Sequence, residues 1–227
     1  HAEDMEISPW DYRLAEDIET VRNCWLSEYY QTRLHMCHVS TRGALDAIQM
    51  AKLRGAPVTC EVTPHHLWFT NDTCDYRVNP PIRTADDVQA LVDGIRSGIV
   101  DAIATDHAPH SREEKSKGLE KSAMGVVGLE TSFAASYTHL VKKGILPLEK
   151  LVELMHTSPM RRFGCGTEIA VGQPADLTVF DLNKTYTVDP EAFLTMGRAT
   201  PFAGTCLTGA CKLTMIGGEI VWKEDML

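Results

Sequence analysis

Three short strand-like runs alternate with helical segments, and this alternation constrains the fold more than any other feature of the sequence. The runs cover residues 33–40, 57–62 and 101–105. Apolar residues at i, i+4 and i+7 within residues 14–29 predict an amphipathic helix. Strands that alternate with helices favour βαβ units and a parallel sheet. Further helices are predicted over residues 41–55 and 84–98 and within a helix-rich stretch, 128–163.

The pattern changes near Gly166. GQPADLTVFDL (172–182) and KLTMIGGEIVW (212–222) are β-rich runs punctuated by glycine, with no helical pattern between them. We therefore predict two domains, an α/β part over residues 1–165 and a β-rich part over residues 166–227.

Composition and charge exclude several classes of protein. The 227 residues carry 22 Lys and Arg against 31 Asp and Glu, a net charge of −9, which argues against nucleic-acid or anionic-membrane partners. No apolar run reaches the roughly 18 residues needed to span a bilayer. The acidic start, His1 to Asp4, is unlike a signal peptide, and the missing initiator Met indicates a fragment or processed piece. The seven cysteines form no Cys-x-x-Cys pair, so we expect buried free thiols in a cytoplasmic protein.

Polar residues gather where the predicted strands end. His38 ends the first run, His65 and His66 follow the second, and Asp106 follows the third. His1 fits the clipped end of a preceding strand. Because the carboxyl ends of the strands form the active-site face of an α/β barrel, these groups are predicted to converge.

Histidine nitrogen and aspartate oxygen are ligands that catalytic zinc prefers, so the cluster suits a metal-dependent hydrolase. Taken alone, His38 also fits a core histidine and Asp106 a helix N-cap, but His110 four residues after Asp106 favours a site. His65 and His66 are predicted to be structural or to orient ligands rather than to bind metal. Three other histidines are predicted to lie outside the site: His35, His139 and His156.

The segment Asn79 to Arg83, NPPIR, predicts a rigid loop. The Asn79 amide can bind a planar amide or imide as both donor and acceptor. The alternative is a simple turn with Arg83 solvated or paired to a neighbouring Asp. The pair Gly125 and Gly128 suggests a close approach of the backbone to a ligand.

Several motifs together resemble the class I dihydroorotases of the amidohydrolase superfamily. The combination of NPPIR with ATDHAPH and EEK is specific, whereas PADLTVFD marks only the superfamily. The motifs are CHVST (37–41), CEVTPHHL (60–67), NPPIR (79–83), ATDHAPHSREEK (104–115), GVVGLET (125–131) and GQPADLTVFDL (172–182).

The resemblance implies the second half of a metal-dependent-hydrolase (β/α)₈ TIM barrel over residues 1–165, and a small composite β domain over 166–227. It implies one or two zinc ions and the reversible cyclisation of N-carbamoyl-L-aspartate to L-dihydroorotate in pyrimidine biosynthesis. His1 and His38 match zinc ligands, Asp106 matches an aspartate that binds metal and shuttles a proton, and Asn79 and His110 match substrate-binding residues.

The chain also departs from that family. It contains no His-x-His-x-Arg motif and no counterpart of the bridging carboxylate. We therefore expect no turnover from the isolated 227-residue polypeptide.

Two alternatives stay open. One is a related cyclic amidohydrolase, such as a hydantoinase, dihydropyrimidinase or allantoinase. The other is a non-catalytic chain that scaffolds aspartate transcarbamoylase. The predicted partners are a small-molecule substrate and other copies in a homo-oligomer, with aspartate transcarbamoylase as a further candidate partner.

Overall fold

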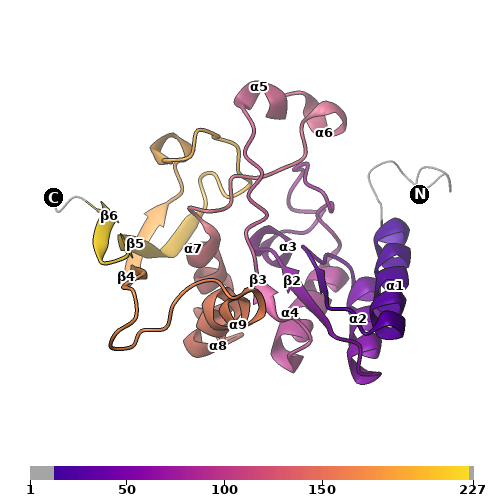
Figure 1. Cartoon of the computed structure of the whole chain (residues 1–227). Coiled ribbons are helices and arrows are strands. Elements are labelled where there is room, and N and C mark those ends of the chain that lie inside the picture. Colours follow the sequence, from indigo (N-terminus) through magenta and orange to yellow (C-terminus); the bar gives the residue numbers. More distant parts are fainter. Residues whose placement is uncertain (1–12, 225–227) are drawn as a thin grey trace. The chain divides into compact units, whose positions relative to one another are not determined.

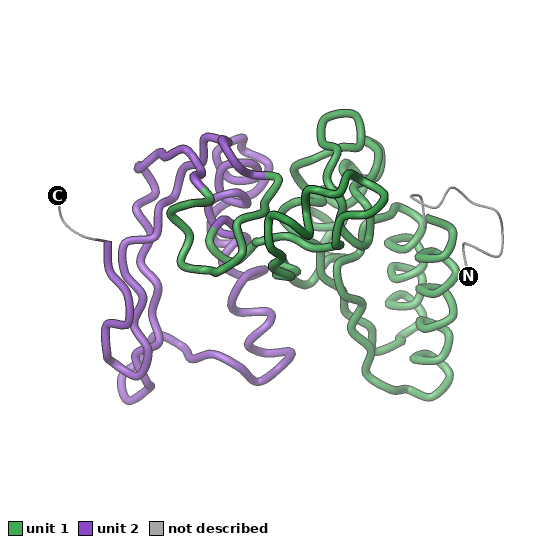
Figure 2. Tube along the Cα trace, turned by 90° about the horizontal axis from the view of Figure 1, so that it is seen from above, with its two compact units in different colours: residues 1–130, 190–201 green, residues 131–189, 202–227 purple. Residues whose placement is uncertain are grey.

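The computed structural model describes residues 13–224. They form two compact units, which Figure 2 colours separately. Unit 1 comprises residues up to 130 together with 190–201, and unit 2 comprises residues 131–189 with the segment from 202 onward. The predicted domain division at 165/166 follows the change of fold type along the chain, and it stays a prediction.

A parallel sheet in the order β1-β2-β3 forms the centre of unit 1 (Figure 1). The strands are β1 (Leu34–Met36), β2 (Val58–Val62) and β3 (Ala102–Ile103). In the register, Leu34 lies beside Val58 and Val62 beside Ile103. The predicted parallel sheet is confirmed. Its helices are α1 (Arg13–Tyr30), α2 (Arg42–Leu53), α3 (Pro64–Trp68), α4 (Ala85–Ser97), α5 (Arg112–Lys115) and α6 (Gly118–Lys121).

The helices begin and end where their local sequence predicts. The Thr41 hydroxyl accepts a hydrogen bond from the Ala44 amide at 3.1 Å and caps α2. Helix α4 ends at Gly98, whose φ of +78° suits a residue without Cβ. The first predicted strand is shorter than expected, because the backbone leaves the extended conformation at His38, where φ is +40°.

The core of unit 1 lies between the sheet and its helices. Val58, Cys60 and Val62 alternate along β2 and are buried, whereas Thr59 and Glu61 between them are only half-buried. Helix α2 packs on β2 with Ile48 fully buried. The other face of the sheet therefore carries the polar side chains. The apolar stripe predicted on α1 is exposed in the described structure, at Leu14, Ile18, Val21, Trp25 and Leu26.

Unit 2 joins a helical segment to an antiparallel sheet in the order β4-β5-β6. The Phe133 ring stacks on Phe180 of β4 with centroids 3.7 Å apart. A Cβ at Gly209, where φ is +100°, would press against Phe133 and Tyr137. The elements are α7 (Ser132–Ser136), π-helix η2 (Tyr137–Val141), α8 (Leu148–Val152), π-helix η3 (Glu153–Thr157), α9 (Ser158–Phe163), β4 (Leu177–Thr187), β5 (Cys206–Ile216) and β6 (Glu219–Lys223).

The cysteines are all free, as predicted. The expectation that they are buried holds for Cys24 and Cys60 but is wrong for Cys37, Cys165 and Cys206, which are exposed. Within residues 13–224, no helix has the length and hydropathy needed to cross a bilayer.

Candidate metal centre

Two of the predicted metal ligands occupy an unusual backbone conformation. His38, just after β1, has φ +40°, and Asp106, just after β3, has φ +47°. Across residues 13–224, Gln31 is the one other non-glycine residue with positive φ. Each such residue costs on the order of 1–3 kcal/mol, and these conformations cluster at functional sites. At both positions the positive φ ends the alternation of side chains along the strand, and both positions lie at the carboxyl end of the parallel sheet.

His38 and Asp106 interact electrostatically. Burial raises the pKa of the Asp106 carboxyl, His38 lowers it, and Glu61 raises it again. The His38 Nδ1 atom is buried and has no hydrogen-bond partner. A buried nitrogen without a hydrogen bond lowers the stability of the fold, and a bound metal ion or ligand would offset that cost.

The adjacent histidines of α3 have different surroundings. His66 is saturated, since its Nε2 donates to the Pro80 carbonyl at 2.9 Å and its Nδ1 lies 2.8 Å from the Thr63 hydroxyl. Burial lowers its pKa to about 4, so it holds the NPPIR loop as a neutral ring. His65 is buried too, yet its Nε2 has no hydrogen-bond partner, and burial lowers its pKa well below the usual value. The sequence doublet did not distinguish a bonded ring from an unpaired one.

A cavity of about 570 Å³ opens beside β1. Its lining includes His38, Asn79 and Met124. The predicted ligand and the predicted substrate-binding amide therefore face a common space. Asp106 and His110 are not part of its lining.

His110 lies next to the loop that follows α6. Its Nε2 donates to the Met124 carbonyl at 3.0 Å, and Met124 lines the cavity. A Cβ at Gly125 would come within 2.3 Å of the Ala108 carbonyl oxygen. The close approach suggested for this glycine is therefore to the chain's own backbone rather than to a ligand.

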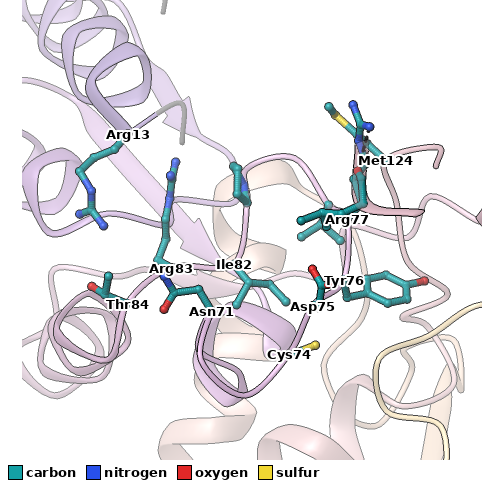
Figure 3. Close-up of a pocket in the computed structure, with 13 residues that line it drawn as sticks. Arg13, Asn71, Cys74, Asp75, Tyr76, Arg77, Ile82, Arg83, Thr84 and Met124 are labelled. Atoms are coloured by element: carbon teal, nitrogen blue, oxygen red, sulfur yellow. Dashed lines mark hydrogen bonds between the residues drawn. The ribbon is translucent and has the colours of Figure 1, made fainter. Parts of the chain in front are cut away.

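Arg83 is engaged within the protein. Its Nε donates to the Ser40 hydroxyl at 2.9 Å, and its guanidinium lies 3.0 Å from the Glu16 carboxylate. The alternative of a paired arginine is therefore the observed one, with a glutamate in place of the expected aspartate. A second cavity, of about 240 Å³, has Arg13, Arg83 and Met124 in its lining. Figure 3 shows it, with Arg83 near Arg13 at one end and Met124 toward the other.

His35 was predicted to lie outside the site, which stays a prediction, and the structure places it in a separate group of possible ligands. His35, Cys37 and Glu61 each offer one ligand atom within 4.8 Å of the others. Cys37 directly follows β1 and is two residues from His35, so both side chains fall on the same side of the chain, and that spacing could have revealed them. His139 and His156 belong to unit 2, where each has a local partner.

The described residues fit a metal ion. His38 and His65 each present a buried nitrogen without a partner, and Asp106 lies beside His38. Imidazole and carboxylate donors suit zinc and related divalent ions. His1, the third predicted ligand, lies outside the described residues.

The amidohydrolase family model matches residues 14–221. That range is nearly the whole chain and includes both strained strand ends. The chain belongs to the amidohydrolase family. Its resemblance to dihydroorotases is also confirmed. A dihydroorotase from Bacillus cytotoxicus is 42% identical over 218 residues, and one from Clostridium botulinum is 45% identical over 225 residues.

The alignments cover 93% and 99% of this chain but only 51% and 56% of those two relatives. The chain therefore spans about half the length of the curated relatives it matches.

Solved structures agree on the fold. An L-hydantoinase (dihydropyrimidinase) from Arthrobacter aurescens is 33% identical and has a TM-score of 0.86, covering 93% of this chain and 49% of that one. A D-hydantoinase from a Thermus species has the same TM-score at 24% identity, again over 93% of this chain and 49% of that one. The predicted fold class, part of a (β/α)₈ barrel followed by a small β-rich part, is confirmed.

Proposed function

We propose that this chain forms part of a metal-dependent cyclic amide hydrolase whose substrate is L-dihydroorotate, formed reversibly from N-carbamoyl-L-aspartate. The relatives at 42% and 45% identity are named dihydroorotases, which supports this substrate over other cyclic amides. The proposal carries with it a role in pyrimidine biosynthesis and a cytoplasmic location.

One observation carries the proposal. The two residues that motif matching assigns to the metal, His38 and Asp106, are the ones held in strained left-handed backbone at the ends of β1 and β3. A purely structural histidine or N-cap has no need of this conformation. Strain of this kind persists where the surrounding structure over-determines it for function.

Asp106 is proposed to carry the proton. Its carboxylate would take a proton from the attacking water and return it to the ring nitrogen that leaves when the amide bond breaks. Asn79 faces the cavity, where its amide would pair with the donor and acceptor edge of the ring. His110 would bind the anionic part of the substrate from beside Met124.

His38, Asp106 and His1 are proposed to hold the metal, with His65 as a further candidate through its unpaired Nε2. One or two zinc ions would polarise the amide carbonyl and make water a stronger acid. His66 is proposed to support the site only indirectly, by holding Pro80.

The test is turnover by the natural polypeptide that contains residues 1–227, loaded with zinc, on L-dihydroorotate. Asp106→Asn keeps the size of the side chain and removes the base, so we expect kcat to fall by about 100-fold or more with little change in KM. Asp46→Asn, an exposed position on α2, is the matched control and should leave kcat unchanged. Normal turnover by the Asp106 variant would refute the proposed role.

The similarity to L-hydantoinase favours a second candidate, hydrolysis of hydantoin-type rings. Comparing kcat/KM on dihydroorotate and hydantoin decides between the two. If neither ring is hydrolysed and the protein holds well under one zinc per chain, the scaffold for aspartate transcarbamoylase becomes the better hypothesis. Assembly into a homo-oligomer also stays a prediction.

A further inference from the structure

His35, Cys37 and Glu61 form a group on the polar face of the β1–β2 pair. His35 pairs with Thr59 across the two strands, and extending that register by two residues brings Cys37 beside Glu61. The Nε2 atom of His35 is 3.1 Å from a Glu61 carboxylate oxygen. All three ligand atoms lie within 4.8 Å of one another. His35 lies on β1 and Glu61 on β2, and Cys37 directly follows β1.

Thr59 lies against the back of the His35 ring. Its hydroxyl is 2.7 Å from Nδ1 of His35 and 3.4 Å from the Leu34 carbonyl oxygen. This contact orients the ring so that Nε2 faces the Glu61 carboxylate. A cation between Nε2 and the carboxylate would satisfy both, and the nearby Cys37 sulfur adds a third ligand atom.

We propose that this cation is a divalent metal ion of the zinc type, bound by Nε2 of His35, Sγ of Cys37 and a carboxylate oxygen of Glu61. Nitrogen, sulfur and oxygen donors together suit zinc and cobalt better than magnesium or calcium. On binding, the Cys37 thiol releases its proton to solvent and binds as the thiolate. Thr59 would orient the imidazole through Nδ1, as partners of metal-bound histidines commonly do.

The geometry needs only a small adjustment. With metal–ligand bonds of roughly 2.0 to 2.3 Å, neighbouring ligand atoms in a tetrahedral site lie roughly 3.5 Å apart. His35 and Glu61 already meet that limit, and Cys37 is exposed, so its side chain is free to turn toward them. The exposure also leaves a coordination position for water.

This site differs in chemistry from the one assigned to His38 and Asp106. Its sulfur donor has no counterpart there, and the inference does not rest on the proposed hydrolase function. A metal probe that reports sulfur ligation therefore tests it without an assay of hydrolase activity.

The experiment is titration of the metal-free natural polypeptide with Co²⁺, followed by absorption spectroscopy. Thiolate bound to Co²⁺ gives a ligand-to-metal charge-transfer band in the near ultraviolet, whereas nitrogen and oxygen ligands do not. We expect this band in the wild-type protein and its displacement by Zn²⁺. Its absence at saturating Co²⁺ would overturn the proposal.

Variants assign the band to this group of residues. Cys37→Ser should abolish it, and Glu61→Gln and His35→Gln should weaken it strongly. The matched control Cys165→Ser removes another exposed thiol and should leave the band intact. Circular dichroism establishes that each variant is folded, and Glu61→Gln stands in if a cysteine variant does not fold.

Asp106→Asn distinguishes the two metal sites. If the band persists in that variant, the thiolate belongs to the His35, Cys37 and Glu61 group. If Asp106→Asn removes the band while Glu61→Gln leaves it, Cys37 binds the metal of the other site and the proposal is wrong.

Discussion

Two groups of buried or half-buried polar side chains in unit 1 differ in how they are satisfied. The helix-end cluster, in which Glu16 joins Ser40 to Arg83, makes hydrogen bonds throughout. Glu16 accepts from both the Ser40 amide and the Ser40 hydroxyl, at 2.8 and 2.6 Å, as well as from Arg83. The strand-end cluster, His38, His65 and Asp106, instead holds two unpaired nitrogens and two strained backbones.

His38 and Ser40 are two residues apart, so the difference does not come from their place in the chain. A satisfied polar cluster stabilises the fold and fixes where its helices begin. An unsatisfied and strained one lowers stability, and it persists where binding or chemistry needs it. The helix-end cluster is therefore structural, and the strand-end cluster is the candidate site.

The largest effect on stability is expected from Arg83→Ala. Its removal leaves the Glu16 carboxylate, whose side chain is 14% exposed, without its cation. Breaking a buried ion pair on one side costs about 3–5 kcal/mol, so the free energy of unfolding in urea should fall by about that amount. Arg96→Ala removes an exposed arginine, 50% exposed and 3.8 Å from Asp93, and is the control. If both variants lost the same free energy of unfolding, the helix-end cluster would contribute no more to stability than an exposed ion pair.

A smaller loss is expected from Asp87→Asn. Asp87, at the start of α4, accepts from Arg13 at 2.6 Å, from the Thr84 hydroxyl at 2.6 Å and from the Arg42 amide at 3.1 Å. We expect the free energy of unfolding to fall by about 2 kcal/mol near pH 7, because each hydrogen bond to a charged group contributes about 1.5 kcal/mol or more.

The pH dependence sharpens that prediction. Burial raises the pKa of Asp87, but the bonds from Arg13, Thr84 and Arg42 outweigh it and lower the pKa from 3.8 to about 2. The carboxylate's stabilisation is therefore complete above about pH 4 and is lost as the pH falls through about 2. The difference in the free energy of unfolding between wild type and variant should therefore disappear as the pH falls from about 4 to about 2. A gap that stays constant down to pH 2 would contradict the ion-pair explanation.

The smallest effect has the opposite sign. His38→Gly should raise the stability of the metal-free protein by about 1 kcal/mol, because glycine adopts positive φ without steric cost. Gln31→Gly is the control, because Gln31 is an exposed residue with φ +51° outside the site. It measures how much stability is gained by relieving backbone strain alone.

Metal binding separates the two glycine variants. Zinc affinity should fall for His38→Gly and stay unchanged for Gln31→Gly, as measured by titration against a chelating indicator. A His38 variant that is both less stable and fully able to bind zinc would reverse the interpretation of the strand ends.

The sequence predicted the elements of the fold well because their signals are local. Thr41 as the cap of α2 and Gly55 just past its end depend on neighbouring residues alone. The alternation of strands and helices likewise predicted a parallel sheet. The strand limits were less accurate, since the turn of the backbone at His38 depends on contacts from β2, such as the bond from the Val39 amide to the Glu61 carbonyl.

The assignment of the candidate site stays a prediction. His38 and Asp106 were assigned to it from their position after strands and from motifs, and Asn79 from its motif. His35 was set aside because one histidine within a strand says nothing of what lies across from it. Its partner Glu61 is 26 residues away, and the pairing depends on the register of β1 with β2.

By itself, the sequence determined the family, the order of helices and strands, and which side chains follow each strand, because periodicity, caps and motifs are properties of short segments. Only the tertiary structure decided which polar atoms are paired. His65 and His66 are neighbours in the chain, yet only His66 donates to the carbonyl of Pro80, which is 14 residues away. Hydrogen bonding depends on distances between atoms remote in sequence, and only the packed sheet sets those distances.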